Sequence, residues 1–465
     1  MEQKMLKMDL SQVTRNIAEV SLARPVGHVS EIFQDKIRIT GLSQFARTGD
    51  ILTVGLGESA LRAEVVQIGK KDLVAMVDGI TDRIQMNDSV AYDGVARLHP
   101  SDHWKGRIID PFGAPMDGKH LMCGVNPINV RAAPPDASKR RPLGPRLETG
   151  LAAFNTFLPI VTGQRVGLFA GSGVGKSTLL GMMCQGIQAD TIVIGLVGER
   201  GRELMEFVTN VLGQEGLARS VVVAATSDQA PQTRRRCAWT AMAVAEHFRD
   251  QGQNVLLLLD SVTRFAEAHR EVAVAGGEDA SLRGFPASTN HMITALCERA
   301  GPGPEGKGDI TAVFSVLVAG SDMEEPIADM MRGVLDGHIV LDREIAERGR
   351  FPAIDLQRSV SRALPEAATA EQNKILLAAR KLLATYTRSE MMIQAGLYVS
   401  GSDPDIDASI LAYPEIDNFL TLSGQDITTD FARLGRAVRA GQKSPMMGKS
   451  SLVSVDQQAG NKFEV

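Results

Sequence analysis

The sequence predicts an α/β chain in three folded parts: a core built on a doubly wound parallel sheet, a small antiparallel β-barrel before it and a helical domain after it. Three observations support this fold class. Apolar runs alternate with helical stretches from about residue 150 to 365, the pattern of a parallel sheet. Short alternating runs separated by Gly or Asp turns occupy the region from Pro25 to Asp93. After residue 366 the pattern becomes helical.

Residues 1–22 form a unit of their own at the start of the chain. Apolar side chains recur there at spacings of four, three, four and three residues, which places them on one stripe of a helix. Such a stripe is usually packed in a core, but ahead of a separate domain it also suits docking on a partner helix. The stripe consists of Leu6, Leu10, Val13, Ile17 and Val20.

Residues 23–95 predict the β-barrel. Segments such as 36–39 and 50–54 alternate apolar and polar side chains, and turn residues separate them at the short intervals of an antiparallel barrel. Barrels of this size often bind ligands or nucleic acid. Tyr92 is the one Tyr or Trp in this part of the sequence, and no basic pattern accompanies it, so we expect a structural domain without nucleic-acid contacts.

Residues 96–365 predict the sheet domain, entered through a proline- and glycine-rich approach that extends to residue 150. A buried strand is expected over 165–170, and a helix is expected to follow the Gly-rich turn after it. In that setting backbone N–H groups converge on phosphate oxygens, so the turn is a P-loop. Lys176 would neutralise the β- and γ-phosphates, and the Ser177 hydroxyl would bind Mg²⁺. The phosphate-binding residues are Gly171, Ser172, Gly173, Val174, Gly175, Lys176, Ser177 and Thr178, preceded by Ala170 where Gly is more usual.

Two acidic residues end apolar strands of the same domain. Asp260 closes the run 255–260, and Glu199 follows the run 191–197. Because the carboxyl ends of parallel strands meet at one edge of a sheet, both carboxylates are expected beside the P-loop. Asp260 would hold a water of the Mg²⁺ shell, and Glu199 would polarise the water that attacks the γ-phosphate. Alternatively, Glu199 belongs with Arg200 to a solvated charge cluster at a helix start.

The last part of the chain predicts a helical domain over 366–441 and a mobile tail over 442–465. The helical pattern is clearest over 374–383, where Leu, Ile and Ala alternate with basic residues. The tail carries Ser, Gly, Gln and Asn with few large apolar side chains, which is typical of a segment that has little to bury.

The composition is ordinary for a globular protein. Hydrophobic residues make up 44% and charged residues 23% of the 465 residues, and the formal net charge of −5 gives no electrostatic case for nucleic acid or an anionic membrane. No segment reaches the roughly 18 apolar residues needed to span a bilayer, and the N-terminus has no signal-type apolar core. The cysteines are scattered without metal-ligand spacing, which favours reduced thiols in a cytoplasmic protein.

Several segments together resemble the catalytic subunits of rotary ATPases and, most closely, the ATPases of type III protein export. Beside the P-loop they are 198–203 (Gly-Glu-Arg-Gly-Arg-Glu), 260–264 (Asp-Ser-Val-Thr-Arg) and 352–362, which fits the superfamily signature of Pro, small, aliphatic, Asp, three residues and Ser-x-Ser. The resemblance implies Mg²⁺-dependent hydrolysis of ATP coupled to protein export, with flagellar assembly as the leading expectation.

The resemblance also assigns further site residues. Arg362 would reach the nucleotide of a neighbouring subunit and neutralise charge that develops on the phosphoryl oxygens. Phe351 lies where the family places an aromatic residue against adenine. Arg200 is a further catalytic candidate beside Glu199 and Lys176. Because one chain carries both Glu199 and Arg362, identical copies can complete one another's sites, and the family implies a homohexameric ring.

The partners implied by the resemblance are a dimeric stator-like regulator bound by the N-terminal helix, export chaperones with their substrates, and a membrane export gate. The protein would release chaperones from substrates and feed the substrates to the gate, docked at the inner face of the cytoplasmic membrane. The alternatives are an injectisome ATPase, the catalytic chain of a rotary ATP synthase, a nucleic-acid motor like the hexameric transcription terminator and a non-hydrolysing regulatory subunit. The scarcity of aromatic residues in the barrel argues against the nucleic-acid motor, and Glu199 against the regulatory subunit.

Overall fold

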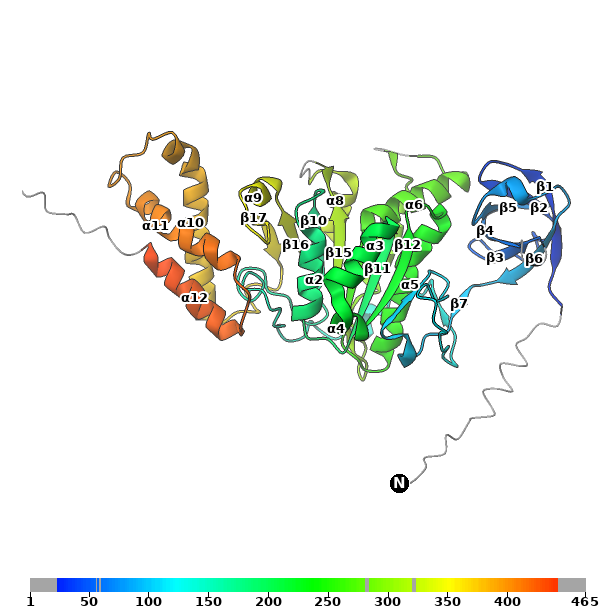
Figure 1. The fold of residues 1–465 in the computed structure, drawn as a ribbon, viewed down its shortest axis with the longest axis horizontal. Coiled ribbons are helices and arrows are strands. Elements are labelled where there is room, and N and C mark those ends of the chain that lie inside the picture. The colour runs from blue at the N-terminus through cyan, green and yellow to red at the C-terminus, as the bar shows by residue number, and fades with distance from the viewer. Residues whose placement is uncertain (1–22, 56, 58–59, 281–283, 320–322, 442–465) are drawn as a thin grey trace, which may run out of the picture.

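The computed structural model describes residues 23–55, 57, 60–280, 284–319 and 323–441. The predicted N-terminal helix (1–22) and tail (442–465) lie outside the described residues. Three parts follow one another along the longest axis, with the barrel at one end, the sheet domain in the middle and a group of helices at the other end (Figure 1). The predicted fold class is confirmed.

The N-terminal barrel closes through six antiparallel strands in the order β1-β2-β5-β4-β3-β6. Inward-pointing side chains alternate with outward-pointing ones along these strands, so Val29, Ile37 and Val90 are completely buried. The strands are β1 (Val26–Ile32), β2 (Lys36–Thr40), β3 (Ile51–Val54), β4 (Leu61–Ile68), β5 (Asp72–Val77) and β6 (Ser89–Gly94).

A buried ion-pair cluster joins the barrel to the sheet domain. Glu64 of β4 is only 3% exposed, and its Oε1 accepts hydrogen bonds from Arg131 Nη2 at 3.0 Å and Arg235 Nη2 at 2.7 Å. A buried carboxylate needs such partners, because an unpaired charge away from water is costly. The two arginines come from the approach segment and from a helix of the sheet domain, so the cluster fixes the barrel against both.

The sheet domain has the strand order β17-β16-β10-β15-β13-β11-β12-β8. Neighbours along this path are parallel except at the edge, where β17 runs antiparallel to β16. The strands are β8 (Arg107–Ile109), β10 (Arg165–Ala170), β11 (Thr191–Glu199), β12 (Ser220–Thr226), β13 (Val255–Asp260), β15 (Asp309–Leu317), β16 (Gly337–Leu341) and β17 (Ile354–Ser361). Short pairings add β14 (Gly301–Pro302) to β15 and join β7 (Arg97–Leu98) to β9 (Ile128–Asn129).

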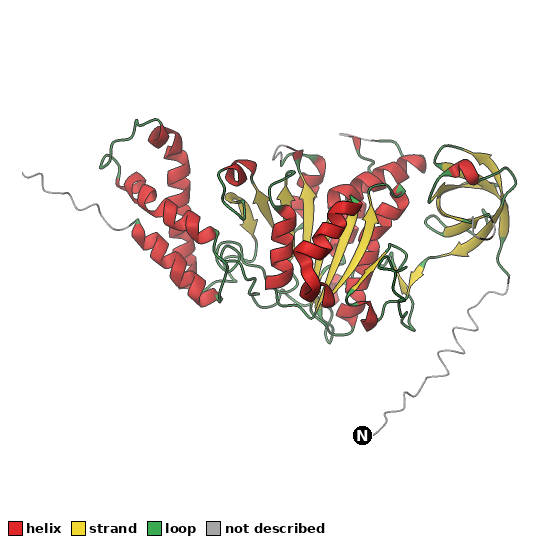
Figure 2. Ribbon diagram, viewed as in Figure 1, coloured by secondary structure: helices red, strands yellow, loops and turns green. Residues whose placement is uncertain are grey.

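Helices cover both faces of this sheet (Figures 1 and 2). One apolar layer packs Leu180 and Met183 of α2 on the sheet, and the other packs Phe248 of α5 and Phe265 of α6. Burial on both faces explains why the strands are continuous apolar runs rather than alternating ones. The helices are α2 (Lys176–Gly186), α3 (Gly201–Glu206), α4 (Gly213–Ala218), α5 (Pro231–Asp250), α6 (Val262–Ala275), α7 (Ser288–Glu298), α8 (Pro326–Val334) and α9 (Arg343–Glu347).

The C-terminal domain contains α10 (Ala370–Gln394), α11 (Pro404–Leu420) and α12 (Ile427–Ala440). A capping box of Thr369 and Gln372 starts α10, and Asp426 caps α12. A buried hydrogen bond joins the sheet domain to this domain. Asn155, which is completely buried, donates through Nδ2 to Asp430 Oδ2 at 2.9 Å. Among the helices that the structure describes, none is long and apolar enough to cross a membrane.

Candidate active site

The P-loop joins β10 to α2 at the carboxyl edge of the parallel sheet (Figure 1). Gly173 and Gly175 have φ of 78° and 88°, a conformation that L side chains rarely adopt, so glycine is needed to curl the loop around the start of α2. Val174 is buried and anchors the loop from below, whereas Ser177 is exposed at the first turn of the helix. The arrangement presents backbone N–H groups and a helix N-terminus to the space above the sheet.

Lys176 and Asp260 meet at this edge. Lys176 Nζ lies 2.5 Å from Asp260 Oδ1, at the end of β13, and the carboxylate is almost completely buried. Ser315 of β15 donates a second hydrogen bond to the same oxygen at 2.6 Å. Strand β15 lies between β10 and β13, so its hydroxyl bridges the gap between the two sequence-predicted residues. The sheet order therefore brings the P-loop lysine and the strand-end acid together.

Glu199 lies at the same edge, at the end of β11. The register of β11 against β12 shifts between Val197 and Glu199, at Gly198, whose φ is 69°. The pKa of Glu199 is raised to about 7, chiefly by burial and also by the neighbouring Asp260 charge, while Lys176 lowers it. The side chain is thus close enough to sense both members of the Lys176–Asp260 pair, and it is poised near neutrality to accept a proton.

Arg200 has different surroundings from Glu199. Its side chain is 80% exposed and pairs with Glu203 at 3.1 Å, one turn further along α3. The structure thus places Arg200 on the surface beside the site and outside the buried group of Lys176, Asp260 and Glu199. Its catalytic role remains a prediction.

Phe351 reaches the P-loop from the segment that precedes β17. A Cβ atom added to Gly175 would lie 3.5 Å from Phe351 Cδ1, so the ring lies beside the loop at van der Waals distance. Phe351 is 51% exposed, so about half of the residue is accessible beside the loop. A flat apolar face next to a phosphate-binding loop is suited to stacking on a base.

Arg362 lies at the opposite edge of the sheet. It follows Ser361, which pairs with Gly337 at the start of β16, and β16 runs parallel to β10 with His338 opposite Gly167. The P-loop follows the other end of β10, about 13 Å further along the strand direction at the usual rise per residue. Arg362 is exposed, its N–H donates to the Asp336 carbonyl at 3.0 Å, and its Nη2 donates to the Arg332 carbonyl at 3.3 Å. The structure does not bring Arg362 to the P-loop of its own chain.

The donor atoms at the carboxyl edge fit Mg²⁺. Asp260 supplies a carboxylate and Ser177 a hydroxyl, and hard oxygen ligands in small number are what Mg²⁺ uses when it keeps its waters and binds substrate phosphates. Within the described residues there is no group of three or more His, Cys, Asp and Glu side chains that would form an all-protein metal cage. Ser177 and Asp260 are therefore the residues that would hold the ion.

Ser315 is the site residue that sequence reasoning missed. Its signal is a hydroxyl inside the apolar stretch 312–317 (Ala-Val-Phe-Ser-Val-Leu), where every side chain up to Val316 is buried. A buried hydroxyl must find a partner, but the sequence does not say which strand supplies it. The partner became evident only from the sheet order, which places β15 between the P-loop strand and Asp260.

Two family models match the chain. The nucleotide-binding domain of the ATP synthase alpha/beta family matches residues 150–361, and the C-terminal domain of the type III secretion ATPase EscN matches residues 368–432. The first range contains the P-loop, Glu199, Asp260 and Phe351, and the second contains most of the C-terminal helices.

Curated relatives and solved structures match over most of the chain. The flagellum-specific ATP synthase of Caulobacter vibrioides is 42% identical and covers 86% of this chain and 92% of the relative. That of Bacillus subtilis is 43% identical, over 80% of this chain and 85% of the relative. The assembled ATPase EscN from the enteropathogenic E. coli type III secretion system superposes with a TM-score of 0.83 at 38% identity, over 89% of this chain and 100% of that structure.

Proposed function

This chain belongs to the family of flagellum-specific ATP synthases, and on that basis we propose that it hydrolyses ATP with Mg²⁺ and that hydrolysis drives type III protein export for flagellar assembly. The observation that carries the proposal is the meeting of Lys176, Asp260 and Glu199 at one sheet edge. Nucleotide binding by itself requires only the P-loop. Glu199, a partly buried carboxylate with a pKa of about 7 beside the P-loop, adds a group suited to activating water.

Each residue of the carboxyl edge has a distinct task. Lys176 exchanges its contact with Asp260 for the β- and γ-phosphates when nucleotide enters, because a multiply charged phosphate competes well for an ammonium group. Ser177 and Asp260 would hold Mg²⁺, which would neutralise charge on the phosphate oxygens. Glu199 orients the attacking water and takes its proton. Phe351 stacks on adenine, with its exposed face turned to the base.

Arg362 acts on a neighbouring subunit. Its position at the amino edge of the sheet, away from its own P-loop, supports an arginine finger supplied in trans. Such a finger accelerates phosphoryl transfer by ~10³–10⁵, because its fork neutralises charge on the transferring group. Identical chains that each present a P-loop and a finger form a homohexameric ring, and an assembled form of the related EscN supports this arrangement.

The export machinery supplies the remaining partners. EscN has been solved in complex with its central stalk EscO, and that complex matches this chain with a TM-score of 0.81, which supports a stalk partner here. The N-terminal segment 1–22 binds a dimeric stator-like regulator, and loss of co-purification on removal of residues 1–20 tests this contact. The ATPase releases chaperones from export substrates and feeds the substrates to the membrane gate. An injectisome is the second candidate, because EscN serves type III secretion.

The test separates binding from chemistry. Lys176→Ala should abolish hydrolysis, since the γ-phosphate loses its main cation. Glu199→Gln should keep nucleotide binding and lower kcat by about 10²–10⁴, the usual contribution of a positioned base. Glu206→Gln, the same change at an exposed site on α3, is the matched control.

Two outcomes would refute the assignment. Normal phosphate release by Lys176→Ala chains would mean that the loop does not hold the γ-phosphate. Loss of both binding and folding in Glu199→Gln, with Glu206→Gln unaffected, would make Glu199 a structural residue of the β11 end.

A further inference from the structure

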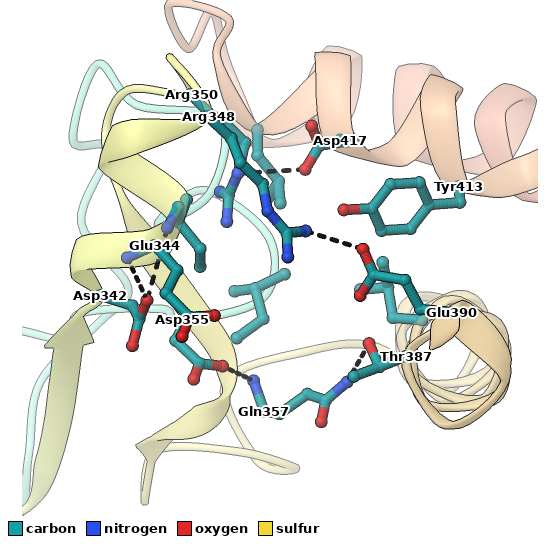
Figure 3. A pocket seen from close by; sticks show the side chains of 14 residues that line it. Asp342, Glu344, Arg348, Arg350, Asp355, Gln357, Thr387, Glu390, Tyr413 and Asp417 are labelled. Carbon is teal, nitrogen blue, oxygen red and sulfur yellow. Dashed lines mark hydrogen bonds and ion pairs between the residues drawn. The ribbon is translucent and has the colours of Figure 1, made fainter. Parts of the chain in front are cut away.

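The turn that carries Phe351 is tied to the C-terminal domain across a cavity of about 250 Å³. Figure 3 shows Arg348 and Arg350 reaching from the segment after α9 toward Glu390 on α10 and Asp417 on α11. Both pairs are short: Arg348 Nη1 lies 2.8 Å from Glu390 Oε1, and Arg350 Nε lies 3.0 Å from Asp417 Oδ1. Two ion pairs thus span the same boundary, one residue apart on either side of Gly349.

The two arginines differ in what else they hold. The guanidinium of Arg350 is 11% exposed and also donates through Nη2 to the Ile354 carbonyl at 2.8 Å and through Nη1 to the Pro352 carbonyl at 3.5 Å. It therefore closes the turn Phe351-Pro352-Ala353 from inside. Arg348 is 53% exposed, and the hydrogen bond recorded for its guanidinium goes to Glu390.

Asp417 sets the orientation of the Arg350 fork. The Asp417–Nε contact fixes one side of the planar guanidinium, which leaves the opposite N–H groups aimed at the turn carbonyls. Burial raises the pKa of Asp417, and Arg350 and Arg348 counter that shift. The ion pair thus stabilises the charge of a half-buried carboxylate at the domain boundary.

We propose that Arg350, held by Asp417 of the C-terminal domain, is a positioning residue that sets the Phe351 ring against the nucleotide base. The proposal rests on the base contact of Phe351 in the proposed function. Phe351 is half-exposed, and its Cδ1 and Cε1 atoms face Gly175 of the P-loop. The position of the ring therefore depends on the turn that carries it, and Arg350 closes that turn. The C-terminal helices thereby influence how tightly ATP is held without contacting it.

The neighbouring ion pair provides a matched control. Glu390→Gln breaks the Arg348 pair across the same boundary, yet it leaves every contact of Arg350 and the Phe351 turn in place. Arg350→Lys keeps the positive charge but cannot reach Asp417 and both carbonyls at once, because an ammonium lacks the fork. Asp417→Asn keeps the size of the side chain and removes its charge.

The experiment measures KM and kcat for ATP on the full-length chain, at a protein concentration where activity per chain is constant. Arg350→Lys and Asp417→Asn should raise KM roughly two- to tenfold, the range of one lost aromatic contact, with kcat within about twofold of the parent. Glu390→Gln should change neither value. Inhibition by inorganic triphosphate, which has no base, should be unaffected in all three variants.

Two outcomes would overturn the proposal. Equal weakening of ATP and inorganic triphosphate would mean that Arg350 supports the fold or the P-loop rather than the base contact. An equal rise of KM in Glu390→Gln would mean that any contact between the two domains has this effect, without a specific role for Arg350.

The variant Phe351→Ala separates this inference from its premise. When Phe351→Ala raises KM and the addition of Arg350→Lys raises it no further, the base contact and the positioning role both stand. When Phe351→Ala raises KM and Arg350→Lys alone does not, only the positioning role fails. When Phe351→Ala leaves KM unchanged, the base contact itself fails.

Discussion

Glu199 and Asp260 are two carboxylates at one sheet edge with unequal partners. Asp260 accepts hydrogen bonds from both Lys176 and Ser315, so its ionised form is stabilised by one cation and one neutral donor. Glu199 is partly buried and lies near the negative charge of Asp260, and the pKa of Glu199 rises to about 7. Strand register produces this difference, because Asp260 is level with Leu196 and Glu199 continues beyond it.

This difference predicts the pH dependence of activity. A base must be ionised to accept a proton, and a Glu199 pKa of about 7 means that the ionised form increases as pH rises through that value. We therefore expect kcat/KM to increase up to about pH 7 and then level off, and Glu199→Gln should lack this limb. Steady-state rates from about pH 5 to pH 9 measure it. A profile that is flat throughout would show that Glu199 stays ionised in the site.

At the scale of elements, the joint between the sheet domain and the C-terminal helices depends on Asn155. Nothing in the sequence around Asn155 indicates a role for its amide. In the structure its Nδ2 donates to Asp430, and its Oδ1 accepts from the Thr149 N–H at 3.0 Å. Asp430 is completely buried, and the donating amide is one of its partners beside the Gln425 N–H at 3.1 Å and Arg433 Nη1 at 3.4 Å.

Asn155→Asp should loosen α12. It replaces the donor by a second carboxylate against Asp430, and the loss should be about 3 kcal/mol of local stability. The loss should grow with pH, because at low pH one of the two carboxyls keeps a proton and still donates. Hydrogen exchange of the α12 amides reports this opening. Asn418→Asp, the same substitution at an exposed site on α11, should leave exchange unchanged.

The elements themselves were predictable where one physical signal dominates. Strands β10 and β13 begin and end as the sequence indicated, because a strand buried on both faces is a continuous apolar run. The clearest helical pattern, at 374–383, lies within α10, which extends from Ala370 to Gln394 on more polar turns. The partners of Ser315, Asn155 and Arg350 were not predictable, because they depend on which distant segments the topology places side by side.

At the scale of the whole molecule, the P-loop and Arg362 lie at opposite ends of the sheet, and we propose that they complete one site between neighbouring subunits. Mixing variants tests whether they meet between subunits. Lys176→Ala chains and Arg362→Ala chains should each be nearly inactive, and co-assembled rings should regain activity where an intact P-loop meets an intact Arg362. Phosphate release from mixtures of defined ratio measures the recovery.

The control mixture combines Lys176→Ala with Glu199→Gln. Both residues lie at the carboxyl edge of the same chain, so no interface can combine them and activity should stay low. Recovery of activity in this control mixture would point to contamination by parent protein. If the mixture of Lys176→Ala and Arg362→Ala chains regains no activity although size measurements show that they co-assemble, Arg362 does not act across the interface.

The separation of Arg362 from its own P-loop also gives the assembly a direction. A contact that joins the amino edge of one sheet to the carboxyl edge of the next is head-to-tail, so it cannot be satisfied by a symmetric pair. An open row of subunits always leaves one P-loop at one end and one arginine at the other without a counterpart. Closure alone removes both vacancies, so for the same number of subunits a closed ring should hydrolyse more ATP per chain than an open row.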